Sequence, residues 1–106
     1  MRKALVKWNE QPAGILLETE SGYAFTYLPE YLAESRLPAL SVHLPKQTEP
    51  FFSPGLFSVF YDLLTEGANW EAQERLFGVA RSDIMSRLCL TSRTDTVGAI
   101  TLSPLP

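Results

Sequence analysis

Few side chains in this sequence could carry out chemistry. His43 is the single histidine and Cys89 the single cysteine among 106 residues. A catalytic histidine needs a nucleophile and an orienting group, and the sequence suggests neither for His43. Cys89 stands between two leucines, which favours a buried, unreactive thiol. One histidine and one cysteine cannot supply the ligands of a usual structural zinc site, so we expect no metal and no cofactor.

Asp62 and Glu66 are four residues apart in a predicted helix, so their carboxylates share one face. Such a pair can do acid–base work or bind magnesium, but surface acids reach this spacing by chance in many helices. The glycines form no loop of the type that binds phosphate groups. We therefore predict that the protein is not an enzyme and that it acts by binding.

The composition bounds the class of protein. Hydrophobic residues make up 45% and charged residues 20%, as in an ordinary globular chain, and the length predicts one domain over 1–106. The net charge of -3 argues against direct binding of nucleic acid. No stretch reaches the roughly 18 apolar residues of a membrane span, and no signal peptide is visible. With one cysteine no internal disulfide is possible, which is typical of a cytoplasmic protein.

The first half of the sequence predicts short strands joined by tight turns. Side chains alternate in character along three early segments, as in half-buried strands. In the second of these, Ile15 and Leu17 face one way and the acids that follow them face the other. Ser21-Gly22 is typical of a hairpin turn. The predicted strands are 3–8, 15–20, 23–28 and 39–44, the last one bracketed by two prolines.

The second half predicts helices and one closing strand. Ser53 before Pro54 indicates a helix start, with serine as N-cap, and glycines end this helix and the next. Asn69 and Ser82 are the predicted caps of the following two helices. The predicted helices are 54–66, 70–77 and 83–90, and the closing strand is 97–102. This order predicts an α+β fold: a small antiparallel sheet or open barrel of about five strands, with about three helices inserted before the last strand.

Trp70 is the strongest candidate for a binding residue. It lies in the first turn of a predicted helix, where an exposed tryptophan would meet a partner, and a central tryptophan is often worth about 2 kcal/mol or more in an interface. Phe77 is seven residues later and shares its helix face, so the spacing is equally compatible with a core tryptophan. The predicted partner-binding residues are Trp70, with Glu66, Asn69, Glu71 and Arg75 as its polar surroundings.

Five segments, taken in order, resemble the N-terminal subdomain 1 of the HipA family of Ser/Thr kinases. Each segment is short, and their order and spacing carry the resemblance. Thr65 stands where the family has a proline, and 91–96 lacks its usual Gly-Arg-Asp-Cys. The five segments are Gly14-Ile15-Leu16, Phe25-Thr26-Tyr27 with Tyr31-Leu32, Leu40-Ser41-Val42-His43-Leu44-Pro45, Phe60 to Gly67, and Val97 to Leu102.

The resemblance implies a stand-alone copy of this subdomain, because the kinase part of the family follows it and this sequence ends at Pro106. Such copies occur in three-part HipBST toxin–antitoxin systems, where a separate small protein neutralises the toxin kinase. The implied partners are a HipT-like Ser/Thr kinase toxin and a HipB-like DNA-binding protein. A regulatory or helper subunit of a HipA-like kinase, or a co-regulator of a HipB-like repressor, would have the same sequence features.

Overall fold

The computed structural model describes residues 2–67, 70–80, 82–94 and 99–106, without the side chains of 65–67, 70, 73 and 92–94. Its frame is a five-stranded antiparallel sheet in the order β4-β3-β2-β1-β5. The strands are β1 (Arg2–Trp8), β2 (Gln11–Thr19), β3 (Gly22–Tyr27), β4 (Phe51–Ser53) and β5 (Ile100–Leu105). The helices are α1 (Pro29–Ala33), α2 (Ser58–Gly67), α3 (Trp70–Phe77) and α4 (Ile84–Thr94). The predicted α+β fold is confirmed, and one further short helix, α1, precedes β4.

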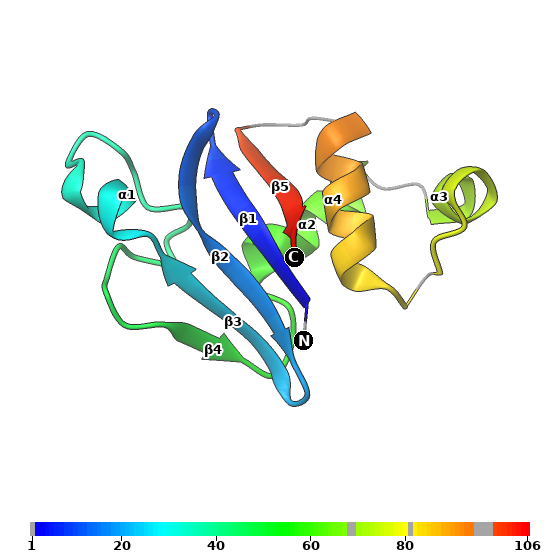
Figure 1. Ribbon diagram of the computed structural model, residues 1–106, viewed down its shortest axis with the longest axis horizontal. Coiled ribbons are helices and arrows are strands. Elements are labelled where there is room, and N and C mark those ends of the chain that lie inside the picture. The colour runs from blue at the N-terminus through cyan, green and yellow to red at the C-terminus, as the bar shows by residue number, and fades with distance from the viewer. Residues whose placement is uncertain (1, 68–69, 81, 95–98) are drawn as a thin grey trace.

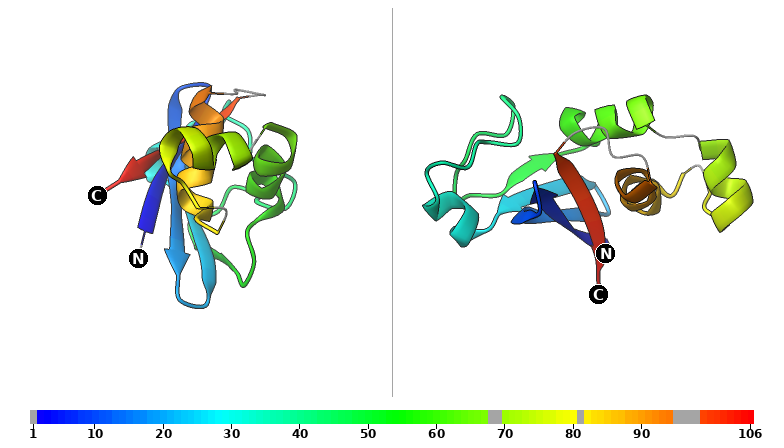
Figure 2. Two further views of the ribbon diagram at one scale, coloured as in Figure 1. Left: turned by 90° about the vertical axis from the view of Figure 1, so that its right-hand side faces the viewer. Right: turned by 90° about the horizontal axis from the view of Figure 1, so that it is seen from above.

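The core lies between one face of the sheet and the helices α2 and α4. Figures 1 and 2 show α2 across this face and α4 beside β5, while none of the described helices covers the opposite face. Ala4, Leu16 and Phe25 are in register on adjacent strands, and all three are buried. Phe60 of α2 and Leu88 of α4 are fully buried in the same cluster. The closing strand returns to the early sheet, since β5 pairs with β1, and it runs to Leu105 rather than to the predicted Leu102.

Leu16, rather than its two neighbours, faces this core. Ile15 and Leu17 share a face as predicted, but it is the open face of the sheet, and both are only partly buried. A run of three apolar residues does not show which face is inside. Pairing of Leu16 with buried Ala4 decides it, because a shift of one residue would turn every side chain over.

Gly14 lets the ring of Phe25 enter the core. A Cβ at this position would lie 2.4 Å from Phe25 Cζ and 2.5 Å from the Thr26 carbonyl oxygen. Both distances are far inside van der Waals contact, so a larger residue would displace the aromatic ring or the strand. This gives a packing reason for the glycine in the first of the five segments described above.

The predicted strand over 39–44 is wrong. This segment is a loop with a tight turn, in which Ser41 and Leu44 form an isolated bridge. The hydroxyl of Tyr27 accepts the backbone N–H of Leu40 at 3.0 Å and donates to the Leu44 carbonyl. These backbone groups are therefore satisfied by a buried side chain, and they need no strand partner.

The predicted helix start at Ser53-Pro54 is also wrong. Ser53 belongs to β4, an edge strand that pairs with β3 opposite Tyr23, and α2 begins five residues later at Ser58. The Phe57 carbonyl accepts the backbone N–H of Tyr61 at 3.0 Å, so Phe57 is the N-terminal cap position. Strand pairing with the sheet prevails over the local Ser-Pro signal.

The helix ends further along agree more closely with the sequence. Gly78 ends α3 with a positive φ of 69°, and its N–H donates to the Glu74 carbonyl at 2.9 Å, a left-handed C-terminal cap. Asp83, rather than the predicted Ser82, caps α4, because its carboxylate accepts the Ser86 backbone N–H at 3.3 Å. Within the described ranges, no helix is long and apolar enough to cross a membrane.

Candidate partner-binding surface

Among the described side chains, those that could do chemistry lie apart from one another. His43 is exposed on the turn after Ser41, and Cys89 is buried in α4. Asp62 is exposed on α2, whereas the side chain of Glu66 is outside the described part. Across the described residues, no three His, Cys, Asp or Glu side chains form a group that could hold a metal ion. The described positions of His43, Cys89 and Asp62 thus lie on three different elements or loops.

Helix α3 stands at one end of the molecule. Figure 1 places it beyond α4, at the opposite end from α1 and its following loop. Glu71 and Arg75 are exposed on this helix. Trp70 is its first residue, but the side chains of Trp70 and Glu66 and the whole of Asn69 lie outside the described residues. The structure thus describes the side chains of two of the five predicted contact residues, and both are exposed on this projecting helix.

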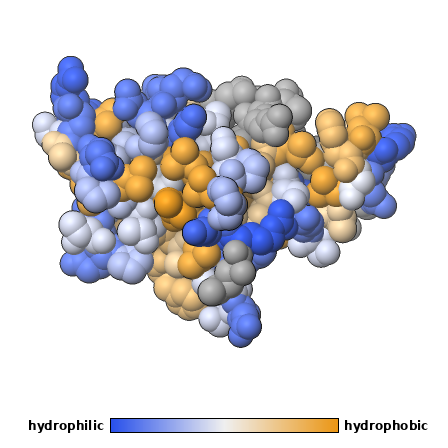
Figure 3. Space-filling view, viewed as in Figure 1, coloured by the Kyte–Doolittle hydropathy of each residue, from blue (hydrophilic) through white to orange (hydrophobic). Residues whose placement is uncertain are grey.

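The last turn of α3 carries two exposed apolar residues that the sequence-based prediction did not include. Leu76 is 71% exposed and Phe77 is 55% exposed. Figure 3 shows hydrophobic surface at this end of the molecule, next to hydrophilic surface. The signal in the sequence was a pair of large apolar residues directly before the Gly78 stop. The spacing of Phe77 from Trp70 left a core face and a partner-binding face equally open, because the pattern does not tell whether a helix face is covered by its own chain.

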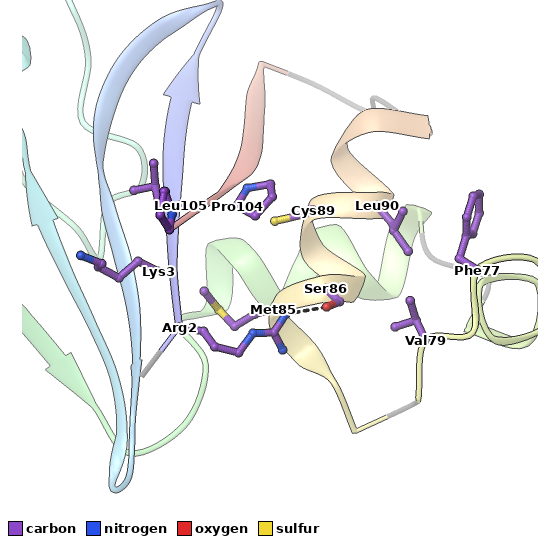
Figure 4. Close-up of a pocket in the computed structure, with 11 residues that line it drawn as sticks. Arg2, Lys3, Phe77, Val79, Met85, Ser86, Cys89, Leu90, Pro104 and Leu105 are labelled. Atoms are coloured by element: carbon purple, nitrogen blue, oxygen red, sulfur yellow. Dashed lines mark hydrogen bonds between the residues drawn. The ribbon is translucent and has the colours of Figure 1, made fainter.

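A groove of about 580 Å³ lies between the end of α3 and the main body. Its floor is one face of α4, and its walls come from the first residues of β1, the last residues of β5 and the segment around Phe77 (Figure 4). Leu90 and Val79 lie on the side toward Phe77, and Cys89 points toward Pro104 on the other side. The lining is mostly apolar, which suits an apolar ligand group. The residues that line it are Arg2, Lys3, Phe77, Val79, Met85, Ser86, Cys89, Leu90, Pro104, Leu105 and Pro106.

Arg2 lines this groove, and its side chain connects β1 to the start of α4. Its guanidinium donates to the Ser86 hydroxyl at 2.6 Å (Figure 4). It also forms an ion pair with Asp83. Partial burial of Asp83 opposes ionisation, but hydrogen bonds from Arg2 and Ser86 and the charge of Arg2 outweigh it, so its pKa lies below the usual value. The contact holds the N-terminus of α4 against β1. Helix α3 precedes α4 in the chain.

The opposite end of the molecule is held by a second polar network. The Tyr31 hydroxyl donates to the Pro38 carbonyl at 2.6 Å. The Lys46 ammonium donates to the carbonyls of Glu34 and Leu37, each at 2.9 Å, and lies 5.4 Å from the centre of the Tyr31 ring. Two apolar residues are exposed here, Val42 at 90% and Phe52 at 59%. Like Leu76 and Phe77 they are large, apolar and exposed, but Val42 lies in the 39–44 loop and Phe52 lies in β4.

These features define an α+β domain that combines a five-stranded antiparallel sheet with a projecting helix and an apolar groove. The family model for the HipA N-terminal domain, Couple_hipA, matches residues 4–103, and the chain belongs to this family. A solved structure titled "N-terminal domain of HipA toxin" has the same fold, with a TM-score of 0.71 and 23% sequence identity. The match covers 100% of this chain and 94% of that one.

The resemblance found in the sequence is therefore confirmed at the level of the family. Several of its motif residues have structural roles in the core: Phe25, Tyr27, Tyr31, Phe60 and Leu64 are buried. The family match covers the N-terminal domain of HipA and not its kinase domain.

Proposed function

We propose that this protein is an antitoxin of the HipS kind, which neutralises a HipT-type Ser/Thr kinase toxin by binding at or near its active site. A HipB-like DNA-binding protein is the third component of such a HipBST system. The protein acts by contact alone and catalyses no reaction. The protein and the kinase meet in the cytoplasm.

The observation that carries this proposal is the family match over 4–103, which relates nearly the whole chain to the N-terminal domain of a toxin kinase. A copy of that domain carries surfaces suited to a kinase of the same family.

The kinase contact is centred on Trp70, with Glu66, Asn69, Glu71 and Arg75 around it. Two observations support this location. Glu71 and Arg75 are exposed, and α3 projects from the body so that a partner can approach its first turn without clashing with the sheet. A tryptophan that enters the active-site cleft of a kinase would exclude substrate and supply most of the binding energy.

The test measures phosphorylation by a purified HipT-type kinase with and without this protein, together with growth of cells that express the kinase. Wild-type protein is expected to suppress both phosphorylation and toxicity. Trp70→Ala is expected to weaken inhibition at least about thirtyfold, the equivalent of a central hot spot. Phe52→Ala is the matched control, because it removes an exposed aromatic at the other end of the molecule. Circular dichroism verifies that both variants are folded.

The sign of the effect separates this proposal from its alternative. An increase in kinase activity on adding the protein would contradict an antitoxin and support a helper subunit. If Trp70→Ala unfolds the domain, the contact assigned to Trp70 is wrong and the residue belongs to the core. A gel shift with a HipB-like repressor, before and after adding this chain, tests the third component separately.

A further inference from the structure

Two adjacent large apolar side chains at the end of α3, Leu76 and Phe77, are exposed, and on α2 Tyr61 is exposed as well. Phe60 and Leu64 of α2 and Leu88 of α4 are buried in the core. Leu76 and Phe77 are more than half exposed at the end of a helix that stands apart from the sheet. Exposed apolar side chains gathered beside a groove are typical of a surface that binds another protein.

The apolar surface continues from α3 into the groove. Phe77 is exposed and also forms part of the groove wall, facing the side where Val79 and Leu90 lie (Figure 4). A partner that covers Leu76 and Phe77 would therefore also reach the groove. Phe77 therefore belongs both to the exposed end of α3 and to the groove.

The charges on α3 indicate what kind of partner fits. Glu71 and Glu74 are exposed together with Arg75, so the described charges of the helix leave an excess of one acid. The whole chain has a net charge of -3. A complementary surface would present a hydrophobic pocket with lysine or arginine residues beside it.

We infer that α3 binds as a whole helix, with Leu76 and Phe77 inserted in a hydrophobic pocket of the kinase and cationic residues of the kinase facing Glu71 and Glu74. The inference rests on the proposed function, because it takes the HipT-type kinase as the partner. It adds a second anchor that is independent of Trp70. Seven residues of helix separate Trp70 from Phe77, a rise of about 10 Å, so the kinase contacts both ends of α3. This is the manner in which an amphipathic helix binds a groove.

The test compares two double variants of the full chain by calorimetric titration into a purified HipT-type kinase. Leu76→Ser with Phe77→Ser is expected to weaken binding at least about tenfold, because buried leucine and phenylalanine side chains contribute strongly to an interface. Val42→Ser with Phe52→Ser removes a similar exposed apolar area at the other end and is expected to change the affinity less than about twofold. Glu74→Lys is a third variant, and its weakening of binding is expected to shrink as salt is raised.

Each outcome separates this inference from the proposed function. If wild-type protein binds and inhibits the kinase while the Leu76/Phe77 double variant binds equally well, the second anchor is wrong and the antitoxin proposal stands. If wild-type protein does not bind the kinase, both proposals are wrong. If the double variant does not fold, Glu74→Lys decides, and unchanged affinity at low salt overturns the inference.

Discussion

Removing the hydroxyl group of Tyr27 should destabilise the fold by an amount that the structure allows us to estimate. Tyr27→Phe keeps the ring, which lies 4.9 Å from the Phe25 ring centre and 5.8 Å from that of Tyr31. It removes the donor to the Leu44 carbonyl and the acceptor of the Leu40 N–H. The change therefore isolates two hydrogen bonds from the surrounding packing.

Each backbone group left without a partner away from water costs about 1–3 kcal/mol, so the two groups together should cost about 2–6 kcal/mol. Domains of this size have a free energy of unfolding of about 5–15 kcal/mol, so the loss is a large fraction of the total. The melting temperature should fall by about 10 °C or more. Denaturant titration gives the free energy, and hydrogen exchange at the Leu40 amide shows whether the loop opens first.

Tyr61→Phe is the matched control, because Tyr61 is exposed on α2 and its loss of a hydroxyl should cost less than about 0.5 kcal/mol. If the two variants were equally stable, the Tyr27 hydroxyl would not organise the loop. Unchanged exchange at Leu40 would lead to the same conclusion.

Two further predictions concern packing and pH. Gly14→Ala should cost about 1–3 kcal/mol, whereas Gly55→Ala, whose Cβ would meet nothing within 4 Å, should cost far less; equal melting temperatures would contradict the tight contact at Gly14. Because the pKa of Asp83 is lowered in the fold, its ionised form stabilises the protein above the unfolded pKa of about 4, and this contribution is lost as pH falls through the folded pKa. Asp83→Asn should therefore be less stable than wild type at pH 6, with a difference that shrinks in denaturant titrations as the pH falls below the unfolded pKa of about 4. A difference that does not depend on pH would refute the assigned role of the carboxylate.

The predictions from sequence succeeded where one local rule decides the structure. Alternating side chains locate β1 and β3, and Gly78 marks the end of α3. They failed where a distant partner decides. The 39–44 loop depends on a hydroxyl group in β3, and β4 has only three residues, too few for a periodic pattern.

The same limit applies to the candidate surface. The helix that carries Glu71 and Arg75 was predictable from its cap and stop signals, and its position at one end of the molecule was not. The contact roles of Trp70, Glu66 and Asn69 stay predictions. Leu76 and Phe77 were missed because a helix face that packs on its own chain and one that packs on a partner have the same sequence pattern.

The pairing of β1 with β5 has a consequence for how the protein forms. Lys3 is in register with Leu105, so the pairing of β1 with β5 joins residues about a hundred positions apart in the sequence. During synthesis, β1 keeps one open edge until β5 has left the ribosome, and only then can Leu102 pair with Val6. Contacts between distant segments of this kind slow folding because a long loop must be closed first. A chain interrupted shortly before Ile100 would contain α1 to α4 and β1 to β4. The edge of β1 would then keep unpaired backbone N–H and C=O groups, with which a strand of another nascent chain could pair.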